Sequence, residues 1–184
     1  TVMDRGVSDS VKVDTLQFEF NDLSSLEDVI NENNEDIACV ILEPAASQCP
    51  QNEFLQQVEA LCKEKGIVFI LDETITGFRW SVSGAQEIFE VTPDLTIFGK
   101  AMANGFSVAA LGGKRQIMEL GSIDTKNTER VFLLSSTHGA EMSSLNAFIA
   151  TTKFYQKNNV VKHLWDYGVD FRNMVDLLIS DYGL

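Results

Sequence analysis

Proline, histidine and basic residues are all scarce in this chain of 184 residues. It has only 3 prolines and 2 histidines, and its 14 Lys and Arg residues face 27 Asp and Glu residues, for a net charge of −13. A chain this acidic lacks the basic surface with which proteins bind nucleic acids or anionic membranes. We therefore expect no nucleic-acid partner and no membrane partner, and we interpret the acidity as favouring solubility.

Long apolar runs and secretory features are absent as well. No stretch approaches the roughly 20 apolar residues that a membrane-spanning helix needs, and the opening TVMDRGVSDS has neither the basic nor the apolar region of a signal peptide. Cys39, Cys49 and Cys62 form no CxxC pair and have no His-x-His companion. Reduced, structural thiols are therefore favoured over a metal site, which predicts a cytoplasmic protein without a bound metal.

The chain has enough apolar content to bury a core. Hydrophobic residues make up 45% of it, which together with its length predicts one domain or a large part of one. It has no initiator methionine, and its last residues, DYGL, follow directly on a segment with a helical pattern. We expect residues 1–184 to form a single partial domain.

Segments with helical spacing of apolar residues alternate with short apolar runs that are typical of buried strands. The helical segments are residues 22–33, 52–66, 139–157 and 160–179. The strands are expected at residues 36–44, 67–73, 93–100, 108–113 and 130–136, the first two buried on both faces. This alternation predicts an α/β fold with a mainly parallel sheet sandwiched by helices.

Polar side chains close several of the expected strands. Glu43 ends the first strand, Asp72 and Glu73 end the second, Lys100 ends the third, and Thr137 follows the last. In open α/β sheets, ligands bind beyond the carboxyl ends of the strands. We therefore expect these side chains to converge on one site.

Each strand-end residue also has a purely structural alternative. Asp72 could cap the next helix or pair with Arg79, and Lys100 could be a solvated loop residue. Glu43 could form a salt bridge at a sheet edge, and Thr137 could be a helix N-cap. The combination and order of these residues favour the shared site.

A lysine and an aspartate at neighbouring strand ends suit one particular cofactor. A partly desolvated lysine becomes a nucleophile that can form a Schiff base, and a buried aspartate is tolerated where it faces a cation. Pyridoxal phosphate offers an aldehyde for Lys100 and a pyridinium nitrogen for Asp72. The two residues are predicted to hold opposite ends of this cofactor.

Several motifs carry a family resemblance. The segments ILEPAASQCP, LDETITGFRW, PDLTIFGK, GGKRQIM and SSTHGAEMSSLNAF follow one another in the order seen in class III pyridoxal-phosphate-dependent aminotransferases. The sequence is most similar to the glutamate-1-semialdehyde 2,1-aminomutase branch of that family. The resemblance implies the later part of the large domain of the aspartate aminotransferase-like fold (fold type I). The upstream phosphate loop and the C-terminal small domain are expected to lie outside these residues.

The resemblance also assigns roles to single residues. It implies that Lys100 forms the Schiff base and carries the proton, that Asp72 holds the pyridine nitrogen, and that Thr74 packs on the ring face. Thr137 matches a threonine that reaches the cofactor phosphate of a neighbouring subunit, which implies a homodimer. Glu43 matches a carboxylate near the substrate.

The expected function is pyridoxal-phosphate-dependent transfer of an amino group, as in an aminomutase. Ser107, where the family usually has proline, and the run THGAEMSS depart from the family pattern. Two alternatives therefore stay open. One is an aminotransferase for a keto sugar or another amino compound, and the other is a catalytically silent domain with a structural or binding role.

Overall fold

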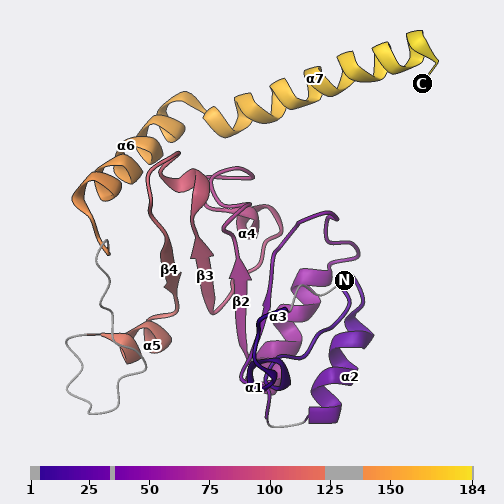
Figure 1. Ribbon diagram of the computed structural model, residues 1–184, viewed down its shortest axis with the longest axis vertical. Coiled ribbons are helices and arrows are strands. Elements are labelled where there is room, and N and C mark those ends of the chain that lie inside the picture. The colour runs from indigo at the N-terminus through magenta and orange to yellow at the C-terminus, as the bar shows by residue number, and fades with distance from the viewer. Residues whose placement is uncertain (1–4, 34–35, 123–138, 184) are drawn as a thin grey trace.

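A four-stranded sheet forms the centre of the molecule (Figure 1). The computed structural model describes residues 5–33, 36–122 and 139–183. The strands lie in the order β1 (Cys39–Leu42), β2 (Val68–Asp72), β3 (Leu95–Phe98) and β4 (Ala110–Gly113). β1, β2 and β3 are parallel, and β4 is antiparallel to β3, so the predicted α/β fold with a mainly parallel sheet is confirmed. The strand expected at residues 130–136 lies outside the described residues.

Seven α-helices occur among the described residues. They are α1 (Asp9–Val13), α2 (Leu23–Asn33), α3 (Phe54–Lys65), α4 (Ala85–Ile88), α5 (Arg115–Met118), α6 (Met142–Asn158) and α7 (Val160–Tyr182). Two short 3-10 helices also occur, at Lys100–Met102 between β3 and β4 and at Glu119–Gly121 directly after α5. The four helices predicted from apolar spacing correspond to α2, α3, α6 and α7, and their positions are confirmed to within a few residues.

Local sequence signals account for the ends of the first two long helices. At the start of α2, Asp22 Oδ1 accepts hydrogen bonds from the Ser24 hydroxyl (2.6 Å) and the Ser25 N–H (3.2 Å). α3 ends at Gly66, whose φ of 70° lies in the left-handed region, and the Gly66 N–H bonds to the Cys62 carbonyl. Asp and Gly are residue types that favour these two kinds of helix end.

The main core lies between one face of the sheet and helices α2 and α3. In the register of the two strands Val40 stands beside Phe69 and Leu42 beside Leu71, so these side chains point to one face. Val40, Phe69 and Leu71 are buried in a cluster with residues of both helices, namely Leu26, Ile30, Phe54, Leu55, Val58 and Cys62. This packing holds β1 and β2 against the two helices.

The opposite face of β1 is open. Cys39 and Ile41 point to it, and Ile41 is 50% exposed. The prediction that the strand at residues 36–44 is buried on both faces is therefore wrong among the described residues. The physical reason is that β1 lies at the edge of the sheet and that α2 and α3 pack on the same face.

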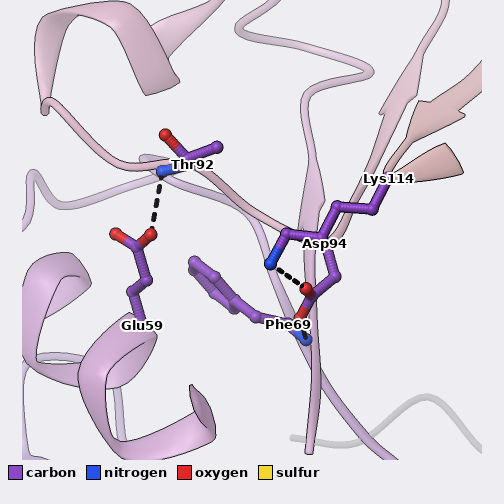
Figure 2. A network of polar contacts seen from close by, with 5 residues as sticks. All are labelled: Glu59, Phe69, Thr92, Asp94 and Lys114. Atoms are coloured by element: carbon purple, nitrogen blue, oxygen red, sulfur yellow. Dashed lines mark hydrogen bonds and ion pairs between the residues drawn. The ribbon is translucent and has the colours of Figure 1, made fainter. Parts of the chain in front are cut away.

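Polar contacts join three strands at the amino edge of the parallel strands (Figure 2). Asp94 precedes β3, accepts a hydrogen bond from the Phe69 N–H of β2 (2.7 Å) and pairs with Lys114 after β4 (2.5 Å). The Lys114 N–H also donates to the Asp94 carbonyl (2.9 Å). Nearby, Glu59 of α3 accepts from the Thr92 N–H (3.3 Å). This edge is thus held by side chains as well as by the strand ladder.

A second apolar cluster lies near the carboxyl edge. Phe78, Ala101, Met102 and Ala103 pack there against Tyr155 of α6. α7 then runs away from the sheet as the most projecting part of the molecule (Figure 1). Near its start, the Trp165 Nε1–H donates to the Arg79 carbonyl (2.9 Å), and the Trp165 ring lies edge-on to Trp80.

Candidate active site

Three predicted site residues lie at the carboxyl edge of the parallel strands. Glu43 follows β1 directly, Asp72 is the last residue of β2, and Lys100 comes two residues after β3. Because these strands are neighbours in the order β1-β2-β3, their ends face the same side of the sheet. Thr137, the remaining strand-end residue, lies outside the described residues.

The Asp72 carboxylate is half-buried and takes part in few contacts among the described residues. Its Oδ1 accepts a hydrogen bond from the Thr74 N–H (2.9 Å). The described ion pairs do not include Asp72, and Arg79, the alternative partner, instead donates from Nη1 to the Ile75 carbonyl (2.7 Å). A half-buried carboxylate with this surrounding is stabilised by a cation that approaches its free side.

Lys100 has an unusual backbone conformation. Its φ of 43° lies in the left-handed region, which non-glycine residues seldom occupy outside functional or tightly constrained sites. The residues that follow it, Ala101 and Met102, are buried and anchor this segment. The side chain itself is exposed, so the partial desolvation predicted for it is not present among the described residues.

Thr74 connects the Asp72 segment to the Lys100 segment. Its side chain is half-buried, and a Cβ atom placed on Gly99 would lie 3.3 Å from the Thr74 Cγ2 methyl. Such contact is tighter than ordinary packing, so the small size of Gly99 lets the two segments approach. Thr74 therefore contacts the Asp72 carboxylate through its N–H and approaches the residue before Lys100 through its methyl group.

Glu43 borders a small hollow. Its Oε2 atom is buried and has no hydrogen-bond partner among the described residues. The hollow has a volume of about 240 Å³, and it is lined by Glu43 together with Phe20, Ala46, Ser47 and Gln48. No described ion pair contains Glu43, so the salt-bridge alternative is not supported. A buried acceptor of this kind is suited to a donor that enters the hollow.

Glu73 belongs to the same strand end but faces the protein. It is fully buried, and its carboxylate accepts hydrogen bonds from the Thr76 hydroxyl and from the N–H groups of Ala85 and Gln86. The sequence alone does not name these partners. Every residue type except proline has a backbone N–H, so the sequence could not identify Ala85 and Gln86 as donors to Glu73.

The donor set at this edge fits pyridoxal phosphate. The Asp72 carboxylate, which has no ion pair among the residues that the structure describes, and the Lys100 amine lie at neighbouring strand ends, and Thr74 approaches Gly99 between the two segments. The carboxylate suits a protonated ring nitrogen, and the amine suits an aldehyde. No group of His, Cys, Asp and Glu side chains in the described ranges has the arrangement of a metal site.

Comparison with known proteins decides the family. The family model for class III aminotransferases matches residues 8–181. The chain belongs to the class III aminotransferase family. This class III chain has no described helix that is long and apolar enough to cross a membrane.

Two sequence relatives carry the same enzyme name. Glutamate-1-semialdehyde 2,1-aminomutase 1 of Lachnoclostridium phytofermentans is 37% identical over 190 residues, which cover 98% of this class III chain and 42% of that protein. The aminomutase of Chlorobium limicola is 43% identical over 144 residues, which cover 74% of the chain and 33% of that protein. The chain thus spans less than half the length of these relatives.

Solved structures show the same fold. A transaminase with PLP bound aligns over 98% of the class III chain and 42% of its own, with a TM-score of 0.87 and 23% identity. The omega-transaminase from Sphaerobacter thermophilus aligns over 84% of the chain and 36% of its own, with a TM-score of 0.76 and 28% identity. The fold predicted from the sequence is therefore that of the transaminases.

Proposed function

We propose that this chain carries part of the active site of a pyridoxal-phosphate-dependent aminotransferase similar to glutamate-1-semialdehyde 2,1-aminomutase. The observation that supports it most is the pair formed by Asp72, which has no ion-pair partner among the described residues, and Lys100, which follows the neighbouring strand. The relatives named as aminomutases and the transaminase neighbours support the same reaction class.

When bound, pyridoxal phosphate supplies an aldehyde and an electron-withdrawing ring. In this proposal Lys100 would hold the aldehyde covalently, and its amine would also carry a proton to and from the substrate carbon. Asp72 would stabilise a positive charge on the ring nitrogen, and Thr74 would pack against the ring. Each role belongs to a side chain at the carboxyl edge of the sheet.

Glu43 is proposed to face the substrate. Its buried Oε2, which has no hydrogen-bond partner in the described part of the chain, belongs to a residue that lines a hollow beside the same sheet edge, where it can accept a hydrogen bond from an amino group. An amino compound that also carries a carbonyl group suits a site that moves an amine between neighbouring carbons. An aminotransferase for another amino or keto compound would use Lys100 and Asp72 in the same way.

The remaining parts of the site are proposed to come from outside the described residues. We assign the chain to the large domain, and we assign the phosphate contact to Thr137 across a homodimer interface, as the family resemblance implies. The chain covers 42% of the Lachnoclostridium relative, so a phosphate loop and a small domain are proposed to complete the enzyme. The unpaired thiols of Cys39, Cys49 and Cys62 support a cytoplasmic location.

Lys100→Ala tests the proposal. In the full-length protein, added pyridoxal phosphate is expected to give a visible absorbance band that Lys100→Ala abolishes, because the only proposed covalent attachment is lost. Borohydride reduction followed by peptide mass mapping should place the label on Lys100.

Lys63→Ala is the matched control, because Lys63 is an exposed lysine in the last turn of α3, away from the strand ends. It should keep the band. A label on another lysine, or a protein without the band, would contradict the proposal.

Product analysis with amino and keto substrates then separates the two reactions: an amine retained within one molecule indicates the mutase, and a released keto product indicates the transferase.

A further inference from the structure

The residue next to Asp72 uses all its polar atoms within the protein. The Glu73 N–H donates to the Ile97 carbonyl of β3 (2.9 Å), and the Glu73 carbonyl accepts from the Gly77 N–H (2.8 Å). Its carboxylate is fully buried and accepts from the Thr76 hydroxyl. Burying a carboxylate is costly unless hydrogen-bond donors surround it, so the protein groups around Glu73 are needed to keep it in this position.

The Glu73 carboxylate also reaches across a loop to the start of α4. Oε2 accepts from the Ala85 N–H and Oε1 from the Gln86 N–H, each at 2.8 Å. These donors are 12 and 13 residues further along the chain, so one side chain closes the whole segment between β2 and α4. The carboxylate therefore sets the path of the residues that directly follow Asp72.

Gly84 shows how closely this segment is fitted around the carboxylate. Its φ is 92°, a backbone conformation that favours glycine, and a Cβ atom there would lie 2.5 Å from Glu73 Oε1. Any side chain at this position would displace the carboxylate or the loop. The contact leaves the loop little freedom to take another path.

The turn that Glu73 fixes contains the groups that surround Asp72. Thr74 lies within the turn closed by the Gly77 N–H, and its own N–H donates to Asp72 Oδ1 (2.9 Å). The Thr74 methyl packs against Gly99, the residue before Lys100. The Glu73 N–H bond to Ile97 ties the same turn to the strand that leads to Lys100.

We propose that Glu73 is a positioning residue for the cofactor site. It holds the 74–84 segment so that Thr74 orients the Asp72 carboxylate and meets the Lys100 segment at the correct separation. This inference rests on the proposed function, since the separation matters only if one ligand contacts both Asp72 and Lys100. Glu73 itself, fully buried, touches no ligand.

Glu73→Gln in the full-length protein tests the role. A glutamine has one carbonyl oxygen and an NH₂ group in place of the second, so the NH₂ would oppose the N–H of Ala85 or Gln86. We expect the Kd for pyridoxal phosphate to rise about tenfold or more. The visible circular dichroism of the bound cofactor should also change, because its orientation between Asp72 and Lys100 changes.

Glu59→Gln is the matched control. It makes the same chemical change at the opposite edge of the sheet, where Glu59 accepts from the Thr92 N–H. We expect wild-type Kd and circular dichroism from it. Both variants are measured well below their unfolding temperatures, so that a loss of global stability does not enter the comparison.

Thr76 provides a second pair of variants if Glu73→Gln does not fold. Thr76→Val removes the hydroxyl donor to Glu73 at nearly constant shape, and Thr76→Ser keeps it. Weaker cofactor binding in Thr76→Val and near-normal binding in Thr76→Ser would support the role.

Unchanged Kd and circular dichroism in Thr76→Val and in any folded Glu73→Gln would overturn the positioning role of Glu73 and leave the proposed function standing. A wild-type protein that shows no Lys100-dependent band would overturn both.

Discussion

Two adjacent carboxylates, Asp72 and Glu73, have opposite surroundings. Glu73 is fully buried and surrounded by protein donors, whereas Asp72 is half-buried and accepts one described hydrogen bond, from the Thr74 N–H. The strand alternates its side chains between two faces, so consecutive residues necessarily meet different environments. The Glu73 carboxylate therefore stabilises the fold, and the Asp72 carboxylate can still bind a ligand.

The three cysteines should differ in reactivity. Burial raises the pKa of the Cys62 thiol to about 12, and the nearby charges of Asp94 and Cys39 act in the same direction. The thiol stays protonated at neutral pH, and a protonated thiol is a poor nucleophile. With a thiol-specific reagent, we expect the exposed Cys39 and Cys49 to react in the native protein and Cys62 only after denaturation.

Cys62→Ala serves as the control for that experiment. It should leave the rapid native reaction unchanged and remove the thiol that appears on denaturation. Three thiols reacting at similar rates in the native protein would show that the Cys62 environment is open to solvent.

At the residue level, the sequence was informative where strand endings carry charge. Asp72 and Lys100 could be placed at one sheet edge because parallel strands end on the same side. The left-handed φ of Lys100 and the partners of Glu73 could not be predicted, because both depend on how distant backbone segments approach. Tertiary contacts of this kind have no local sequence signal.

At the level of elements, Asp94 joins β2, β3 and β4 at the edge opposite the site (Figure 2). Burial alone would raise the pKa of Asp94, but the hydrogen bond from Lys114, the Phe69 N–H and the Lys114 charge together hold it below its usual value of 3.8. The folded state therefore favours the charged carboxylate. Its contribution to stability is present above the unfolded pKa and is lost as the pH falls through the lower, folded pKa.

Asp94→Asn should remove that contribution. Near neutral pH we expect a loss of about 1–2 kcal/mol in the free energy of unfolding, since a buried backbone donor and a lysine lose their charged acceptor. The difference from wild type should shrink as the pH falls through the lowered pKa of folded Asp94, because the wild-type carboxylate then loses its charge. Denaturant unfolding at several pH values measures both effects.

Asp166→Asn is the comparison for Asp94→Asn. Asp166 also pairs with a lysine, Lys162, at 2.6 Å, but both side chains are more than half exposed on α7. An exposed pair of this kind contributes less than about 1 kcal/mol. Equal losses from the two substitutions would contradict the special position of Asp94 between the strands.

The elements themselves were largely predictable, with instructive exceptions. Apolar periodicity located the four long helices, and apolar runs located β1 to β4. α4 was missed because four residues are too few to show a helical period. The burial of β1 was overestimated because an apolar run indicates a strand but does not indicate how many of its faces are covered.

At the scale of the whole molecule, α7 is a helix of 23 residues with no buried side chain. Its exposed apolar residues include Leu164, Trp165, Phe171, Leu177 and Leu178. β1 also presents an unpaired edge in the described sheet. Exposed apolar surface and free strand edges favour association between chains.

Residues 1–184 produced alone are therefore expected to self-associate or aggregate. Light scattering after size-exclusion chromatography at several concentrations should show oligomers, and Leu177→Glu with Leu178→Glu should reduce them. Ser180→Glu, which adds charge at a polar position of the same helix, should have a smaller effect. A monodisperse chain with cooperative unfolding would contradict the expectation.

The antiparallel pairing of β4 with β3 restricts the motion of the segment that contains Lys100. The chain leaves β3 at Phe98 and returns to the sheet at Ala110, which pairs directly with Phe98. Residues 99–109 are thus a closed loop whose two ends share one ladder. Local opening of Lys100 is coupled to fraying of that ladder, so the loop and the sheet form one cooperative unit. Heating is then expected to release a ligand held by Lys100 together with the melting of the sheet and not before it.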